Sequence, residues 1–284
     1  MMIPALPSLM LEPLVRAALL EDLGRAGDIT TDSIVPAQAR AETALVARQA
    51  GVVAGLDLAA MAFRLVDPAI TLEVERPDGT RLKPGDLVGI IAGPARGMLT
   101  AERVALNFLG HLSGVASATA TLVEAVKGHR ARICCTRKTI PGLRAVQKYA
   151  VRVGGGVNHR FGLDDAVLIK DNHVAAAGGV RAAILAARAG VGHLVKIEVE
   201  VDSLAQLEEA LAVGIDAVLL DNMKPDTLAQ AVRMIGGRAV AEASGRITPA
   251  TAPAIAASGV DLISAGWLTH SASVLDIGLD WQGN

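Results

Sequence analysis

The chain has 284 residues, of which 51% are hydrophobic, and its 27 Lys and Arg residues stand against 29 Asp and Glu residues, for a net charge of −2. A chain of this length and apolar content can bury a large core, which excludes an intrinsically disordered protein and predicts one large domain or two of modest size. The near-neutral charge and the 2% aromatic content disfavour nucleic-acid binding. DNA-binding proteins need a cationic surface, and single-strand binders need aromatic rings for stacking.

Cysteine usage and the N-terminal segment predict the compartment. Cys134 and Cys135 are neighbours, and adjacent cysteines form a disulfide only in a strained ring, so we expect reduced thiols and a cytoplasmic protein. Residues 1–24 lack the basic and then apolar pattern of a signal peptide. The longest membrane candidate, residues 104–123, contains polar residues such as His111 and is predicted to be a buried helix rather than a membrane span.

The first part of the chain mixes helical and strand patterns. Apolar residues at helical spacing predict helices at residues 11–23 and 56–66, and a long helix is expected to begin near Thr100, a residue type that often caps helices. Short apolar runs bounded by Pro, Gly and Asp predict strands at residues 42–47, 70–75 and 87–92. These elements predict an α+β unit with an antiparallel sheet.

From residue 130 onward, short apolar runs alternate with helical patterns. The predicted strands lie at residues 133–136, 166–169, 194–201, 217–220, 239–243 and 261–264. The predicted helices lie at residues 142–153, 179–189, 203–213, 225–235 and 248–257. This alternation predicts a parallel sheet with crossover helices, and the lack of a Gly-x-Gly-x-x-Gly sequence favours an α/β barrel over a dinucleotide-binding fold. Residues 271–284 have no helical pattern and are expected to dock back on the first domain.

Polar residues follow almost every predicted strand of the second part, which is where an α/β barrel has its active site. These segments are residues 136–139, 170–173, 221–222, 242–245 and 264–266. A barrel with a purely structural role has no reason to place charges along one rim so consistently. The pattern therefore predicts a functional site at the carboxyl ends of the strands.

Within the strand predicted at residues 194–201, charged and apolar residues alternate from residue 196 to residue 201. Lys196, Glu198 and Glu200 share one face of the strand, and the apolar residues share the other. Because a barrel strand packs its outer face on helices, the charged face is expected to point inward, where charges are costly unless they pair with each other, a metal or an ionic substrate. The alternative is an edge strand with one face in solvent.

A set of cations follows two strands and a glycine-rich loop, residues 154–160. Its members are Arg137, Lys138, His159, Arg160 and Lys170. Because Arg grips carboxylate or phosphate with two hydrogen bonds and Lys adds a point charge, this set predicts a polyanionic small substrate. The three glycines at 154–156 alone are equally compatible with a flexible helix exit.

Carboxylates and small residues complete the predicted site. Glu200 and Asp221 are suitable for a hard cation such as Mg²⁺, which binds through one or two carboxylates plus substrate oxygens. Residues 244–245 and 264–266 offer backbone N–H groups that can hold a phosphate, although each segment alone fits an ordinary turn.

Other catalytic patterns find no support. The chain has no HExxH, paired CxxC or GxSxG motif, which disfavours zinc and serine hydrolases. His111, His129 and His193 lie on an apolar helix or beside glycines and are interpreted as structural. Nothing beyond its presence marks Cys135 as a nucleophile.

Taken together, these residues resemble the quinolinate phosphoribosyltransferase family. The resemblance covers almost the whole chain, and its long central block is specific. The segments that carry it are EDLGRAGDITTDSI, AERVALNFLGHLSGVAS, TRKTIPGLRAVQKYAVRVGGGVNHRFGLDDAVLIKDNH, IEVEVDS, VLLDNM, EASGRI and LISAGWLTHS.

The resemblance implies an N-terminal α/β sandwich at residues 1–115, joined by residues 271–284, and an open seven-stranded α/β barrel at residues 116–270. It also implies a homodimer, with possible further assembly, in which the sandwich of one subunit faces the barrel of the other. The implied reaction combines quinolinate with phosphoribosyl pyrophosphate in the presence of Mg²⁺ and yields nicotinate mononucleotide, pyrophosphate and CO₂. No nucleic acid and no membrane take part.

By motif, the resemblance also assigns roles to residues. Two carboxylates of quinolinate would be held by Arg137, His159, Arg160 and Lys170, and Arg103 would reach across from the partner subunit. Lys138 and Lys170 would contact the diphosphate donor, and Glu200 and Asp221 the ribose hydroxyls and the metal. The remaining substrate-binding positions, most of them on the 5′-phosphate, would be Thr136, Ala243, Ser244, Gly245, Ser264, Ala265, Gly266 and His270.

Three alternatives stay open at the level of sequence. A phosphoribosyltransferase of the same fold acting on nicotinate, or a relative associated with molybdate transport, is the first, and two carboxylates on the substrate explain the number of cations better. An aldolase-type barrel with Lys170 as a Schiff-base amine is the second. A phosphometabolite sensor without catalysis is the third, and it leaves the inward charges of Glu198 and Glu200 unexplained.

Overall fold

The computed structural model describes residues 3–281 and divides the chain into two compact units, each described by itself. Unit 1 holds Met1–Ala120, Ile140–Gly155 and Thr269–Asn284, and unit 2 holds Thr121–Thr139 and Gly156–Leu268. The sequence prediction places residues 116–120 and 140–155 in the barrel domain, whereas they group with unit 1 here. Residues 282–284 of the predicted docking segment lie outside the described residues.

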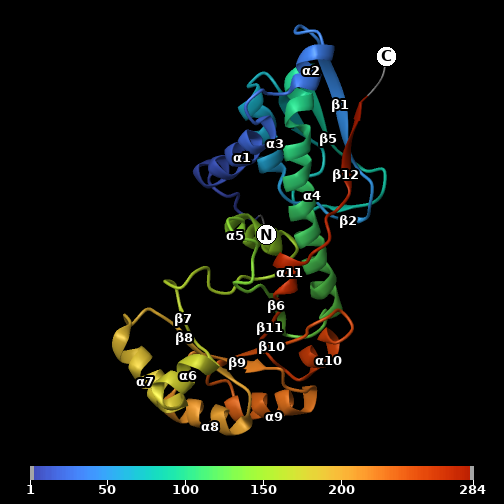
Figure 1. Ribbon diagram of the computed structural model, residues 1–284. Helices are drawn as coiled ribbons and strands as arrows, with labels where there is room; N and C mark the ends of the chain where they lie inside the picture. The colour runs from blue at the N-terminus through green and yellow to red at the C-terminus, as the bar shows by residue number, and fades with distance from the viewer. Residues whose placement is uncertain (1–2, 282–284) are drawn as a thin grey trace. The chain divides into compact units, whose positions relative to one another are not determined.

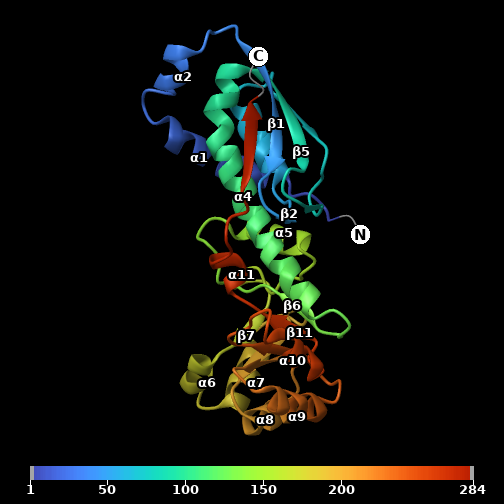
Figure 2. The same ribbon diagram turned by 90° about the vertical axis from the view of Figure 1, so that its right-hand side faces the viewer.

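Unit 1 is built around a four-stranded antiparallel sheet in the order β12-β1-β5-β3. Its strands are β1 (Arg40–Ala47), β3 (Thr71–Val74), β5 (Leu87–Pro94) and β12 (Ile277–Trp281). A separate two-stranded sheet pairs β2 (Gly51–Val52) with β4 (Arg81–Leu82). The helices are α1 (Ser8–Leu23), α2 (Ile29–Ile34), α3 (Leu56–Val66), α5 (Arg144–Val153) and most of α4 (Ala95–Ala125), which runs alongside the four-stranded sheet (Figure 1, Figure 2).

The C-terminal segment docks on this sheet as predicted, because β12 pairs with β1 along five residues of each strand, from Thr43 with Trp281 to Ala47 with Ile277. The predicted start of the long helix is wrong, since α4 begins directly after β5 and Thr100 lies inside it. The Thr100 hydroxyl lies 3.1 Å from Asp28 Oδ2 instead of capping a helix, and Asp28 itself caps α2.

Unit 2 is built around a six-stranded parallel sheet in the order β6-β11-β10-β9-β8-β7. Its strands are β6 (Arg132–Cys134), β7 (Val167–Ile169), β8 (Ile197–Val201), β9 (Ala217–Asp221), β10 (Val240–Ser244) and β11 (Leu262–Ser264). The helices are α6 (Asp171–Ala177), α7 (Val180–Gly190), α8 (Leu204–Val213), α9 (Pro225–Ile235), α10 (Ala252–Ala257) and the start of α11 (Trp267–His270). Helices α7 to α9 cover the outer side of this sheet (Figure 1).

The predicted α/β fold class is confirmed, and the parallel sheet differs from the predicted seven-stranded barrel in the number of its strands. In the part of the chain that the structure describes, six strands form the parallel sheet, and a single parallel bridge between Cys134 and Val157 occupies the place of a seventh. The loop around Val157 follows a run of glycines, which explains why it pairs at one residue only.

Burial follows the pattern expected of barrel strands. In β8, Ile197, Val199 and Val201 are buried against the helices, and the residues between them face the other side. In β9, residues 218–220 are buried on both faces, as is typical of a central parallel strand. Cys134 and Cys135 are buried and are not joined in a disulfide. None of the described helices combines the length and the apolar character that crossing a membrane requires.

Candidate active site

The carboxyl ends of the parallel strands meet at one edge of the unit 2 sheet. Cys134, Ser264, Ser244 and Asp221 lie in register across the neighbouring strands β6, β11, β10 and β9. The residues that follow these positions therefore gather at this edge, where an α/β barrel carries its chemistry.

Most of the predicted site residues belong to this edge or to loops of the same unit. Those in unit 2 are Thr136, Arg137, Lys138, His159, Arg160, Lys170, Glu200, Asp221, Ala243, Ser244, Gly245, Ser264, Ala265 and Gly266. The other two belong to unit 1: Arg103 is exposed on α4, and His270 is exposed at the end of α11, where its Nδ1 lies 2.6 Å from Ser271 Oγ.

Two arginines of unit 2 provide the strongest anion-binding feature. The Nε atoms of Arg137 and Arg160 are both buried and have no hydrogen-bond partner in the described part of the chain. Arg160 is anchored by one bond from Nη1 to the carbonyl of Ala166, at 2.9 Å. Burial and the nearby charge of Arg137 lower the pKa of Arg160. Two close guanidinium groups with unused donors suit an anion with more than one carboxylate.

Lys170 and Glu200 meet at the same edge. Ile169 is in register with Val199, so the next residues along both strands are level, and Lys170 Nζ lies 3.4 Å from Glu200 Oε2. The Lys170 ammonium is half exposed and follows β7 directly, at the N-cap of α6. The pair places a cation and a carboxylate side by side at the rim, where each can contact a different part of a charged ligand.

His159 is held by two partners in unit 2. Its Nε2 lies 2.8 Å from Glu198 Oε2, and its Nδ1 accepts a hydrogen bond of 2.8 Å from the backbone N–H of Arg160. Glu242 is 1% exposed on the central strand β10, and its Oε1 lies 3.9 Å from His159 Nε2 without a hydrogen-bond partner among the described residues. Burial, and secondarily the charge of Glu198, raises the pKa of Glu242 to about 7.

The structure differs from the sequence prediction at two charged residues, Lys196 and Glu242. Lys196 does not share the inward charged face, because its residue precedes β8, its side chain is 77% exposed, and its Nζ bonds Asp216 Oδ1 at 2.5 Å. The other two residues of the predicted face lie beside basic side chains, Glu198 beside His159 and Glu200 beside Lys170. Glu242 belongs to the predicted polar segment 242–245 but was given no role there, although a carboxylate between apolar residues of a central strand was a signal for one.

The turn after β9 is locked to the turn after β10. Asn222 adopts a left-handed conformation with φ of 53°, donates from its backbone N–H to the Ser244 carbonyl at 2.9 Å, and donates from Nδ2 to Asp221 Oδ2 at 2.6 Å. Gly245 has a φ of 105°, and a Cβ there would lie 2.2 Å from Asn222 Oδ1. The two turns therefore fix the direction of the Asp221 carboxylate.

The turn after β11 packs on the residues that follow β6. The Ala265 N–H donates to the Cys134 carbonyl at 3.0 Å. A Cβ at Gly266 would lie 2.8 Å from Lys138 Cδ and 3.4 Å from Thr136 Oγ1. The small residue thus leaves room for the Lys138 stem and brings it beside the backbone of this turn.

Cys135 has the surroundings of a structural thiol. It is 0% exposed, and its Sγ lies 3.3 Å from Asn158 Oδ1, so it donates to a neighbouring amide. A nucleophilic cysteine needs an exposed thiolate, and this thiol is fully buried.

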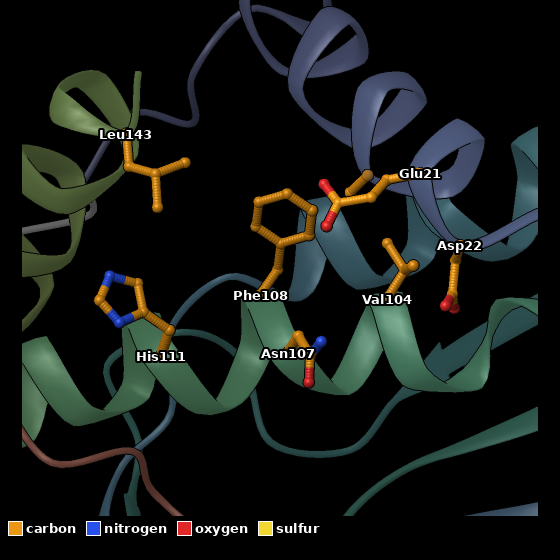
Figure 3. A pocket seen from close by; sticks show the side chains of 8 residues that line it. Glu21, Asp22, Val104, Asn107, Phe108, His111 and Leu143 are labelled. Carbon is orange, nitrogen blue, oxygen red and sulfur yellow. The ribbon is translucent and has the colours of Figure 1, made fainter. Parts of the chain in front are cut away.

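Unit 1 contains a pocket of about 280 Å³ between α1, α4 and the start of α5 (Figure 3). Its lining residues are Ala18, Glu21, Asp22, Val104, Asn107, Phe108, His111 and Leu143. His111 is held by the Nε2 of Gln147 at 2.9 Å, and burial lowers its pKa. The lining contains two carboxylates and neither Lys nor Arg, so this pocket does not suit a polyanion.

Comparison with known proteins finds two domains of one family in the chain. Models of the quinolinate phosphoribosyl transferase N-terminal and C-terminal domains match residues 28–113 and 115–280. The chain is 48% identical over 273 residues to a nicotinate-nucleotide pyrophosphorylase (carboxylating) of Mycobacterium leprae, covering 94% of this chain and 95% of the relative. It is 43% identical over 272 residues to the probable enzyme of that name in Bacillus subtilis, covering 96% and 93%.

Solved structures show the same likeness. NadC from Streptococcus pyogenes superposes with a TM-score of 0.94 at 46% identity, over 99% of this chain and 100% of that one. Human nicotinic acid phosphoribosyltransferase, at 16% identity and a TM-score of 0.61 over 98% and 74% of the two chains, shares the fold alone.

Proposed function

The chain belongs to the quinolinate phosphoribosyltransferase family, and from this premise we propose that it makes nicotinate mononucleotide from quinolinate and phosphoribosyl pyrophosphate. The bond between the ribose C1 and pyrophosphate breaks, pyrophosphate leaves, and C1 bonds to the pyridine nitrogen. The bond from C2 to its carboxylate then breaks, CO₂ leaves, and the electron pair on C2 takes up a proton. The product enters NAD biosynthesis.

The arginine pair is the observation that carries this proposal. The buried Nε atoms of Arg137 and Arg160 lie close together and have no hydrogen-bond partner among residues 3–281, and the Lys170 ammonium lies at the same edge of the sheet. Quinolinate carries two adjacent carboxylates, so two guanidinium groups and an ammonium match its charge and shape better than they match a monoacid. His159 lies beside this pair, next to Arg160 in the chain.

The carboxylates at the rim suit the developing charge of the ribose. Loss of pyrophosphate leaves a ribose with oxocarbenium character, and a fixed carboxylate nearby stabilises positive charge as it forms. Glu200 is proposed to contact the ribose hydroxyls from β8, and Asp221 from β9. Lys138 and Lys170 neutralise the diphosphate that leaves. Once ribosylated, the pyridine nitrogen is cationic and draws electrons from C2, so the protein needs to supply mainly orientation and exclusion of water.

The donor set of Glu200 and Asp221 also fits Mg²⁺. Both groups are carboxylates on neighbouring strands, and Mg²⁺ prefers one or two carboxylates with the rest of its shell made of substrate oxygens and water. When bound, the ion would neutralise charge on the diphosphate. In this proposal, Glu200 and Asp221 hold it, and Asn222 keeps the Asp221 carboxylate in place.

Small residues and a second subunit complete the proposal. The 5′-phosphate is assigned to the turns after β10 and β11, whose residues are Ala243, Ser244, Gly245, Ser264, Ala265 and Gly266, with His270 as a further contact. The active form is proposed to be a homodimer in the cytoplasm, in which Arg103 of one subunit serves the site of the other. The burial of Cys134 and Cys135 as reduced cysteines supports a reducing compartment.

The test measures release of labelled CO₂ from carboxyl-labelled quinolinate by the purified protein with phosphoribosyl pyrophosphate and Mg²⁺. Arg160→Lys keeps the charge and loses the paired donors, so the KM for quinolinate is expected to rise by about 10- to 100-fold. Arg233→Lys, on the exposed face of α9, is the matched control and should leave it unchanged. Turnover of nicotinate without turnover of quinolinate would refute the proposal.

A further inference from the structure

The hydrogen bonds of His159 determine which ring nitrogen carries the proton. The Arg160 backbone N–H can only donate, so Nδ1 at 2.8 Å must be the lone-pair nitrogen. The proton then lies on Nε2, directed at Glu198 Oε2, also 2.8 Å away. A second proton on Nδ1 would point at the Arg160 N–H, so this geometry fits a neutral ring and not an imidazolium.

Arg160 needs such an anchor because of the charge beside it. Its guanidinium lies near that of Arg137, and like charges push the two apart until an anion arrives. The loop that carries Arg160 follows residues 154–156, a run of glycines, and leaves the sheet after the single bridge at Val157. The bond to His159 Nδ1 and the bond to Ala166 hold Arg160 against this repulsion.

Glu198 is placed to hold the ring rigidly. It lies within β8, in register with Leu168 on one side and Ala217 on the other, and its side chain is 12% exposed. Glu242 lies on β10, and its Oε1 is 3.9 Å from His159 Nε2. Glu198 Oε2 is within hydrogen-bond distance of Nε2 at 2.8 Å and Glu242 Oε1 is not, so Glu198 is the acceptor for the Nε2 proton.

We propose that Glu198 is a positioning residue for this reaction: through His159 it fixes the backbone of Arg160, and so the guanidinium that receives a substrate carboxylate. The inference rests on the proposed function for the identity of the diacid. It assigns His159 a role through its neighbour, in addition to any contact with substrate. The chain of contacts runs from β8 through the imidazole to the loop.

Three variants test the chain of contacts. Glu198→Leu removes the acceptor and Glu198→Gln keeps an oxygen at the same distance. His159→Phe keeps the ring volume without either nitrogen. Glu198→Leu and His159→Phe are expected to raise the KM for quinolinate by about tenfold or more, with the KM for phosphoribosyl pyrophosphate changed less than about threefold. Glu198→Gln should restore near-normal values. Glu208→Leu, on the exposed face of α8, is the control.

Two measurements do not depend on turnover. The nitrogen chemical shifts of the imidazoles, with the His159 signals identified by their loss in His159→Phe, report the tautomer directly. We expect the Nε2–H form in the natural protein and in Glu198→Gln. Calorimetry with phthalate, a benzene diacid, should show about tenfold weaker binding in both disruptive variants, and the double variant should be no weaker than either one.

An Nδ1–H or doubly protonated ring in the natural protein would overturn the inference, as would unchanged phthalate affinity in Glu198→Leu. Zn²⁺ binding that Glu242→Gln abolishes would also overturn it, because His159, Glu198 and Glu242 would then act as metal ligands. If quinolinate is not turned over but the tautomer and the phthalate result hold, only the proposed function fails. If Glu198→Leu does not fold, the tautomer of the natural protein still decides.

Discussion

Replacing Glu242 with Gln should make the free energy of unfolding less sensitive to rising pH. The Glu242 carboxyl is 1% exposed, has no hydrogen-bond partner for Oε1 within the described residues, and has its pKa raised by burial from the ordinary 4.5 to about 7. Because the folded protein binds this proton more tightly than the unfolded chain does, the group favours folding most below its unfolded pKa. That contribution is lost as the pH rises through about 7.

The size of the effect follows from the ordinary pKa of Glu242, 4.5, and its raised pKa of about 7. The difference between them corresponds to about 3 kcal/mol of folding free energy between the acid and alkaline limits, and most of this falls between roughly pH 5 and roughly pH 8. Gln has the shape of the protonated acid and does not titrate. The free energy of unfolding of Glu242→Gln minus that of the natural protein should therefore rise by about this amount over the same interval.

Urea unfolding at a single protein concentration, measured at several pH values across that interval, gives the free energy of unfolding as a function of pH for the natural protein and for Glu242→Gln. Glu208→Gln, an exposed carboxyl on α8, is the control and should run parallel to the natural protein. Parallel curves for Glu242→Gln would refute the reasoning, since they would mean that Glu242 titrates alike in the folded and unfolded chain.

Three further predictions concern other parts of the structure. Tyr149→Phe should lower the free energy of unfolding by about 1–2 kcal/mol in urea, because the phenol donates to the buried Asp78 carboxylate at 2.8 Å. Gly245→Ala should raise the KM for phosphoribosyl pyrophosphate and lower the Tm, because its Cβ would collide with Asn222 at a φ of 105°. Removal of divalent metal with EDTA should abolish CO₂ release, added Mg²⁺ should restore it, and Glu200→Gln should raise the Mg²⁺ concentration needed for half-maximal rate.

Much of the fold could be predicted because hydrophobic periodicity is a local property. Helices α3 and α9 have the predicted bounds, residues 56–66 and 225–235, and the strands of unit 2 lie within about two residues of the predicted runs, apart from the later start of β8 at Ile197. The start of α4 was not predictable from a capping residue, since β5 runs into the helix without a loop. Short α6 carries no apolar pattern and no buried residue, so only its tertiary setting reveals it.

The site was predictable by residue type and less so by partnership. The rule that parallel strands end at one edge places Lys170 beside Glu200 and Asp221 beside Ser244, because both follow from register. Lys196 has the same residue type as a site cation, but it precedes its strand and pairs with an exposed carboxylate. The alternation of side chains does not show at which residue a strand begins. Lys196 lies one residue before β8, and it is therefore on the surface and not in the interior.

The charges around Arg160 explain how a nearly neutral protein can hold a cationic site. Burial and Arg137 lower the pKa of Arg160, whereas Glu198 and Asp165 act in the opposite direction. The nearby carboxylates offset the cost of burying these cations, and they cancel the cations in the total charge while leaving the guanidinium donors directed at a ligand. Glu198 serves both purposes, since it bonds His159 and supports the charge of Arg160, so its loss should weaken binding of a diacid more than the loss of a single hydrogen bond to substrate.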